Sequence, residues 1–209
     1  PNRWLQWNLL HTGSGQFDWT VVDAQIAAAD AAGRKYIFWY IGSTGRVRAV
    51  PQWVLNQCPG LGKYQSASGT YYKVWECVAA KNELKNFAIA FGNRYKNDSR
   101  VAYAYATEEL GRIVWQGGIP VSQFAPYYKE LLDTWKQYFG ASKTIHNGYA
   151  PAIQTIDEYA LTIGINIRNG GGFDPVQELI KFPYLDQKFD SNTGYVRRDS
   201  QITPWFGTE

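Results

Sequence analysis

The sequence predicts an α/β fold in which parallel strands alternate with helices through a single domain, residues 1–209. Segments with a strand pattern alternate with segments whose apolar residues recur at helical spacing, as in βαβ units. The run Lys35–Ile41 is almost continuously apolar, which is typical of a strand buried on both faces of a parallel sheet. Two distant strand-like segments, 100–109 and 200–209, each end in glutamate. This pattern indicates a barrel in which the carboxyl ends of the strands share one site.

The elements follow one another with clear boundaries. A first strand is expected at Arg3–Leu10. The helix Val21–Ala32 follows, with Asp18 as a capping residue and Gly33 at its end. After the strand Lys35–Ile41, the expected elements are a helix at Asn82–Lys96, a strand from Arg100, a helix at Phe124–Phe139, a strand at Lys143–Asn147, a helix at Ala152–Leu161, a strand at Thr162–Arg168, a short helix at Asp174–Ile180 and a strand at Gln201–Phe206.

The expected strands are too few for a whole barrel. The chain has 209 residues, whereas a complete (β/α)8 barrel has about 250. The fold class is therefore a TIM-barrel-like (β/α)8 fold that is incomplete or fragmentary. An open remnant would expose two bare sheet edges, so further chain or a partner is expected to complete the barrel.

A long excursion separates the second and third expected strands, from Gly42 to about Val78. Loops of this length in a compact domain usually serve function. The excursion holds both cysteines of the chain, Cys58 and Cys77, which are expected to form a disulfide. A disulfide indicates an oxidising compartment and hence an extracellular or secreted protein, whereas two free thiols would not.

Composition excludes some classes of function. The net charge is +3 and only 19% of residues are charged, too weak a bias for a nucleic-acid-binding protein. No apolar run approaches the length of about 18 residues that indicates a membrane span. The chain contains no Met and begins at Pro1, so we expect a processed protein or a piece of a longer one.

Several stretches resemble a known family. The order of Phe17-Asp18-Trp19, a helix with Asp23, Gly33, a strand and then Pro51-Gln52-Trp53 resembles clan A glycoside hydrolases, including their β-galactosidase-like relatives. The segment Phe87–Val101 is similar to the helix and strand that bring in the acid/base residue of that family. The resemblance covers nearly the whole chain, which looks like barrel strands two to seven.

The resemblance implies a retaining mechanism with two carboxylates. The family usually ends its fourth strand in Asn-Glu, or carries a Gly-Glu pair slightly later. The corresponding residues here are Thr107-Glu108-Glu109 and Gly111-Arg112. Glu108 is the expected acid/base residue, with Glu109 as the alternative, because successive strand residues point to opposite sides. Glu209 matches the position of the nucleophile of the family. Such a pair cleaves a β-linked oligo- or polysaccharide.

Other polar and aromatic residues at expected strand ends are candidates for substrate binding. Polar side chains there can hydrogen-bond sugar hydroxyls, and aromatic rings can stack on pyranose faces. Triple glycine at 170–172, after the sixth expected strand, would let backbone approach a ligand closely. The candidates are Trp39, Trp53, His146, Asn147, Arg168, Asn169 and Trp205.

Other chemistries find little support. The two His and two Cys lack metal-ligand spacing, so no metal is expected. No G-x-S-x-G elbow supports a Ser-His-Asp triad, and no Gly-rich fingerprint follows the first strand, so no cofactor is expected. The competing hypotheses are a non-catalytic glycan-binding or structural extracellular barrel, and an ordinary α/β domain whose glutamates are incidental.

Overall fold

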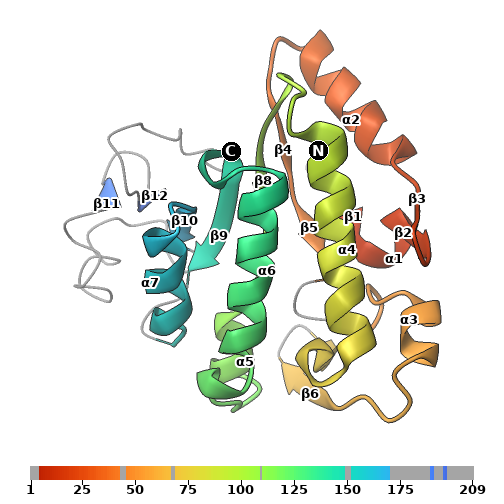
Figure 1. Cartoon of the computed structure of the whole chain (residues 1–209), viewed down its shortest axis with the longest axis vertical. Helices are drawn as coiled ribbons and strands as arrows, with labels where there is room; N and C mark the ends of the chain where they lie inside the picture. Colours follow the sequence, from red (N-terminus) through yellow and green to blue (C-terminus); the bar gives the residue numbers. More distant parts are fainter. Residues whose placement is uncertain are drawn as a thin grey trace.

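The computed structural model describes residues 5–42, 46–66, 69–108, 110–148, 152–169, 189–190 and 195–196. For residues 168–169, 189–190 and 195–196 it describes the backbone alone. The expected helix 174–180 and the expected strand 201–206 lie outside the described residues. Within them, helices α4, α6 and α7 stand in front of a sheet that includes β4, β8, β9 and β10 (Figure 1).

The central sheet is built from parallel strands that are neighbours both in sequence and in space. The strands β4 (Tyr36–Phe38), β8 (Val101–Tyr105), β9 (Thr144–Gly148) and β10 (Asn166–Asn169) pair in parallel in that order. The sheet continues in antiparallel fashion through β12 (Tyr195–Val196) and β11 (Phe189–Asp190). Consecutive parallel strands lying side by side are the arrangement of a (β/α)8 barrel, but the described strands do not close into one.

The structure describes residues 5–10 of the expected strand Arg3–Leu10. Among them β1 (Leu5–Gln6) is extended, and it pairs in parallel with β5 (Tyr40–Ile41), which follows β4 after Trp39. The expected strand Arg3–Leu10 is wrong beyond Gln6, because α1 (Trp7–Leu10) forms a helical turn. Helical spacing buries both Trp7 and Leu10 and brings the Trp7 indole to His11, four residues on. The hairpin of β2 (His11–Gly13) and β3 (Gln16–Phe17) follows.

Helices cover one face of the sheet. The expected helices are confirmed with shifted ends, as α2 (Thr20–Ala31), α4 (Val78–Tyr95), α6 (Ala125–Tyr138) and α7 (Gln154–Thr162). Stacked and tilted rings form the core between sheet and helices, with Phe38 4.2 Å from Phe91 and Trp135 5.5 Å from Phe91. Much of the aromatic content of the chain is therefore core.

The excursion between β5 and α4 is ordered in the described residues. It contains α3 (Gln52–Asn56), the hairpin of β6 (Lys63–Ser66) and β7 (Gly69–Tyr72), and the 3-10 turn Val74–Glu76. The expected disulfide is confirmed, because Cys58 is bonded to Cys77 immediately before α4. Closing a loop of this length stabilises the fold by about 3 kcal/mol in the chain-entropy account. The remaining short elements are α5 (Gly111–Trp115) and the 3-10 turns Val121–Gln123 and Ala141–Lys143.

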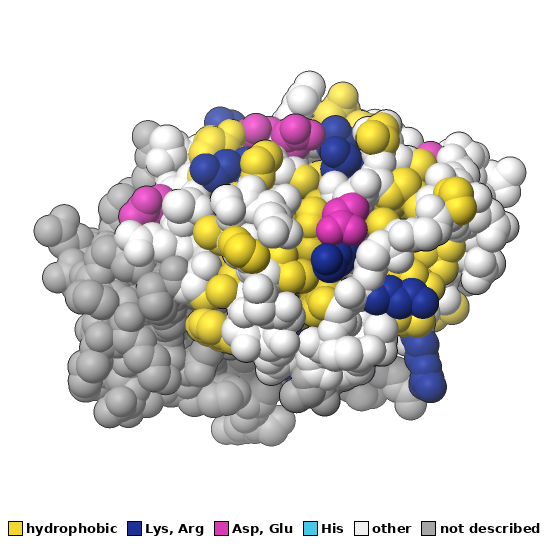
Figure 2. Space-filling view, turned by 90° about the horizontal axis from the view of Figure 1, so that it is seen from below, with side chains coloured by type: hydrophobic (Ala, Val, Ile, Leu, Met, Phe, Trp, Pro, Cys, Tyr) yellow, Lys and Arg dark blue, Asp and Glu magenta, His cyan; other side chains and the backbone are white. Residues whose placement is uncertain are grey.

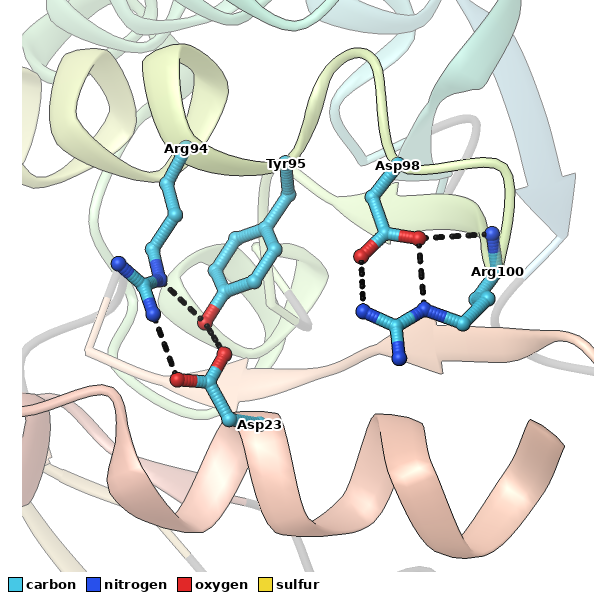
Figure 3. Close-up of polar contacts among 5 residues, drawn as sticks. All are labelled: Asp23, Arg94, Tyr95, Asp98 and Arg100. Atoms are coloured by element: carbon cyan, nitrogen blue, oxygen red, sulfur yellow. Dashed lines mark hydrogen bonds and ion pairs between the residues drawn. The ribbon is translucent and has the colours of Figure 1, made fainter. Parts of the chain in front are cut away.

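Polar contacts fasten α2 to the end of α4 at the edge where the strands begin (Figure 3). Asp23 accepts hydrogen bonds from Arg94, at 2.6 Å, and from the Tyr95 hydroxyl, at 2.7 Å. Beside them, two guanidinium nitrogens of Arg100 donate hydrogen bonds to the Asp98 carboxylate. These hydrogen bonds from Arg100 lower the pKa of the Asp98 carboxyl to about 2. The polar contacts of Asp23 therefore hold α2 near the edge of the sheet where the parallel strands begin.

The closest approach between α4 and α6 lies at Gly92. A Cβ atom there would lie 2.6–2.8 Å from the backbone carbonyl and Cβ of Tyr138. We predict that Gly92→Ala destabilises the protein by about 1–3 kcal/mol, because overpacking outweighs the better helix propensity of alanine. Urea unfolding measures the change, with Asn93→Ala, at the exposed neighbouring position, as the control. A Gly92→Ala protein as stable as the parent would contradict this view of the helix contact.

Candidate active site

The candidate site residues of the described chain gather at the edge of the sheet where the parallel strands end. β5, β8 and β9 run in the same direction and finish at the lower edge in Figure 1. Seen from below, this edge shows hydrophobic side chains spread across its middle, with acidic and basic side chains among them (Figure 2). In barrel enzymes the residues at this edge do the chemistry.

Glu108 follows β8 and turns toward the end of β5. The residue is only 7% exposed, and its Oε1 accepts a hydrogen bond from the backbone N–H of Gly42. Burial, and secondly the Glu108 charge, raises the pKa of the Tyr40 and Tyr64 phenols far above the usual range. The Glu108 carboxylate therefore lies among core aromatic residues between sheet and helices.

The opposite face of the sheet carries a separate aromatic cluster. Trp39 stacks on Tyr105 with 4.6 Å between ring centroids, and Ile145 joins them. Phe38 and Tyr40, on either side of Trp39 in the chain, point into the main core instead. Trp39, a candidate for sugar stacking, is thus on the face away from the helices, half-buried and next to Tyr105. Its role in substrate binding stays a prediction.

Trp53 lies in the main core rather than in open space. Its indole N–H donates to the backbone carbonyl oxygen of His11 at 3.0 Å, and its ring meets the His11 ring edge-on at 4.8 Å. Trp53 is therefore half-buried against the core, and its expected role as a sugar platform stays a prediction. Trp115 of α5 is an exposed tryptophan that the sequence analysis did not select, with 53% of its surface accessible.

His11 is a buried imidazole in this aromatic environment. It stacks on Phe17 at 4.4 Å, and its Nδ1 accepts the Trp7 indole N–H at 3.0 Å. The proton of the neutral ring is therefore assigned to Nε2, which lies 3.6 Å from the Glu83 carboxylate. Burial lowers the pKa of His11 to about 4.

His146 and Asn147 occupy the end of β9 and are both buried. The two ring nitrogens of His146 are occupied: Nδ1 lies 2.7 Å from the Thr107 hydroxyl, and Nε2 lies 2.8 Å from Asp157 Oδ1. Asn147 is 2% exposed, and its Oδ1 has no hydrogen-bond partner among the described residues. A buried carbonyl oxygen without a donor is costly, so it marks a position suited to a donor from a ligand.

Strand register brings two further candidates to the same edge. Arg168 pairs with Asn147, and Asn169 with Gly148, across β9 and β10. Their side chains lie outside what the structure describes. Glu109, Trp205 and Glu209 also lie outside the described residues, so their expected roles stay predictions.

Sequence reasoning missed Asp157. The signal was present in the helical pattern, since Asp157 shares the buried stripe of α7 with Ile153, Ile156, Ala160 and Leu161. A carboxylate on an apolar stripe indicates a buried partner, which here is His146.

Neither a metal site nor a membrane-spanning helix is found in the described part of the chain. In the described ranges, no group of three or more His, Cys, Asp or Glu residues is arranged to hold a metal ion. Among the helices of the same ranges, none is long and apolar enough to cross a membrane.

Comparison with known proteins gives a likeness of fold. No family model matches the sequence, and no curated protein matches it significantly. Among solved structures, the crystal structure of the β-galactosidase from the psychrophilic Marinomonas ef1 is similar, with a TM-score of 0.51 and 12% sequence identity. The match covers 75% of this chain and 34% of that one, so the chain spans about a third of the length of the β-galactosidase. The described part of the chain thus has a mixed α/β fold similar to part of a glycoside hydrolase.

The buried His11 predicts a pH dependence of stability. Its pKa is about 4 in the folded protein against 6.5 for the free side chain, so the unfolded chain binds a proton that the folded one refuses. Stability is therefore complete above about pH 6.5 and declines as the pH falls toward 4. Urea unfolding of the parent and of His11→Gln across this range checks it. An equal slope of stability against pH in both proteins would contradict the assignment.

Proposed function

We propose that the chain is part of a glycoside hydrolase that cleaves a β-linked oligo- or polysaccharide by a retaining two-carboxylate mechanism. The observation that carries the proposal is that the chain after β8, Asn147 of β9 and the end of β10 lie at the carboxyl edge of neighbouring parallel strands. The fold likeness to a β-galactosidase supports it. Further chain or a partner completes the barrel in this proposal, and the confirmed disulfide is compatible with an extracellular location.

The position of Glu108 bears on which glutamate acts as the acid/base residue. The Glu108 carboxylate holds the Gly42 amide and lies on the helix side of the sheet. Glu109, the alternative candidate for this role, lies outside the described residues, and it is proposed here because the carboxylate of Glu108 is already engaged with backbone. We therefore assign the acid/base role to Glu109, the nucleophile to Glu209, and a fastening role to Glu108.

The chemistry follows from this assignment. Glu109 protonates the glycosidic oxygen as the bond breaks, and Glu209 attacks the anomeric carbon to form a covalent glycosyl-enzyme. Water then releases the sugar, with Glu109 acting as the base. The carboxyl groups of such a pair lie about 5–5.5 Å apart.

Asn147 is the best-supported candidate for contact with substrate. A sugar hydroxyl donating to its Oδ1 would satisfy an acceptor that has no partner in the described part of the chain. His146 serves less well in direct contact, because both ring nitrogens already have protein partners. Arg168 and Asn169 pair in register with Asn147 and Gly148, and both are proposed to contribute at this edge of the sheet. Trp39 and Trp205 are proposed as stacking surfaces.

A second function, glycan binding without hydrolysis, is favoured by one observation. The described glutamate at the site edge, Glu108, is engaged in holding the backbone rather than facing open space. The exposed Trp115 offers a ring for a sugar near the same edge. In that case glycan affinity falls with Trp115→Ala and survives replacement of the glutamates.

Single replacements separate these assignments. We expect Glu109→Gln and Glu209→Gln each to lower turnover of an aryl β-glycoside by about 10³-fold, because each removes a group that acts on the breaking bond. Glu108→Gln is expected to keep most of its turnover, since the amide oxygen still accepts the Gly42 N–H. Steady-state kinetics measures the effect.

The control is Glu158→Gln, at an exposed position on α7. If Glu108→Gln loses as much turnover as Glu209→Gln while Glu109→Gln keeps it, the acid/base role returns to Glu108. Turnover retained in all three variants would refute the two-carboxylate mechanism for this chain.

A further inference from the structure

A continuous buried chain of hydrogen bonds crosses from the site edge to α7. The backbone N–H of Asn147 donates to Thr107 Oγ1 at 3.2 Å, and the same oxygen lies 2.7 Å from Nδ1 of His146. On the other side of the ring, Nε2 lies 2.8 Å from Asp157 Oδ1. Thr107, His146 and Asp157 are each at most 1% exposed.

The chain of hydrogen bonds has one direction in which every group is matched. Thr107 Oγ1 accepts from the Asn147 amide, so its own proton is free to go to His146 Nδ1. The ring then carries its proton on Nε2 and donates it to Asp157. A backbone amide at the end of β9 is thereby linked to a carboxylate on a helix behind the sheet.

The threonine hydroxyl replaces a backbone acceptor at the point where β8 leaves the sheet. The last backbone contact between the strands is the Ala106 N–H to the Ile145 carbonyl, at 2.9 Å. One residue later the side chain of Thr107 takes over and satisfies the next amide of β9. The backbone of β8 can then turn away to present the residues after Thr107 while β9 stays in register.

Gly148, at the end of β9, lies close to Ile167 of β10 and next to Asp157 of α7. A Cβ atom at Gly148 would lie 2.7 Å from the Ile167 side chain and 3.4 Å from the Asp157 carboxyl carbon. Apolar side chains of the same size would fill this space without the desolvation of a buried carboxylate. Apolar side chains could not, however, form the directional hydrogen bonds that hold the Asn147 amide and the Thr107 hydroxyl in place.

From this geometry we infer that Thr107, His146 and Asp157 act as positioning residues, holding the ends of β8 and β9 in the arrangement that the site requires. The inference rests on the proposed function for its kinetic consequence. Thr107 is not a nucleophile here, since its hydroxyl is buried, accepts the Asn147 N–H and donates its proton to His146 Nδ1. Its contribution passes through Asn147 and the two glutamates that follow it in the chain.

Kinetics of three variants of the full chain test the inference. Thr107→Val keeps the shape and removes the hydroxyl, and we expect kcat on an aryl β-glycoside to fall by about tenfold to a hundredfold, because small displacements of positioned groups are costly. KM is expected to change less than kcat. Thr107→Ser, which restores the hydroxyl, is expected to return kcat to near the parent value. Asp157→Leu, which is similar in size and removes the acceptor of the His146 Nε2 proton, is expected to behave like Thr107→Val. Glu158→Gln on the same helix is the control.

Nuclear magnetic resonance gives a readout independent of turnover. The chain has only two histidines, so ¹⁵N-labelled imidazoles are assigned by comparison with His11→Gln. We expect the His146 ring to carry its proton on Nε2, and the Nδ1 resonance to move in Thr107→Val and not in Glu158→Gln. Hydrogen exchange of the Asn147 amide is expected to quicken by about tenfold or more in Thr107→Val, since that amide loses its acceptor.

The outcomes separate the inference from the proposed function. If the parent chain hydrolyses no β-glycoside, the proposed function fails, and unchanged exchange of the Asn147 amide in Thr107→Val overturns the positioning role by itself. If the parent is active, wild-type kcat in a folded Thr107→Val, or no recovery in Thr107→Ser, overturns it. Should Thr107→Val fail to fold, Thr107→Ala, which also removes the hydroxyl, is judged by the same two readouts.

Discussion

Two consecutive side chains at the end of β8 hold the strands on either side of it. Glu108 accepts the amide of Gly42 after β5, and Thr107 accepts the amide of Asn147 in β9. When a strand leaves its sheet to form a site, the N–H groups of its neighbours lose the backbone carbonyls that would accept their hydrogen bonds. Buried N–H groups then need other acceptors. Side-chain oxygens supply them here. The geometry of the whole candidate site depends on these two contacts, because they set where each strand ends.

The sheet divides the aromatic residues into two populations with different tasks. Phe38, Phe91 and Trp135 fill the space between sheet and helices and account for much of the stability of the fold. Trp39 and Tyr105 stack on the other face, the face that lines the interior in a barrel.

Sequence reasoning reached the strand and helix order, because apolar periodicity is strong in segments such as Lys35–Ile41 and Phe124–Phe139. It also reached the disulfide, since the chain offers a single pairing of its cysteines. It did not reach α1 or Asp157. The first is a single turn, too short for its periodicity to stand out, in which the Trp7 indole bonds to His11 four residues on. The second depends on a partner eleven residues away on another element, on which local pattern carries no direct information.

The Gly42 contact also has a consequence for the long excursion that follows β5. Gly42 is the residue at which the chain leaves β5, so the carboxylate that accepts its N–H joins the start of the excursion to the end of β8. The disulfide at Cys77 fixes the far end of the excursion immediately before α4. A long segment attached at both ends can change in sequence and in length at small cost to the strands that carry it.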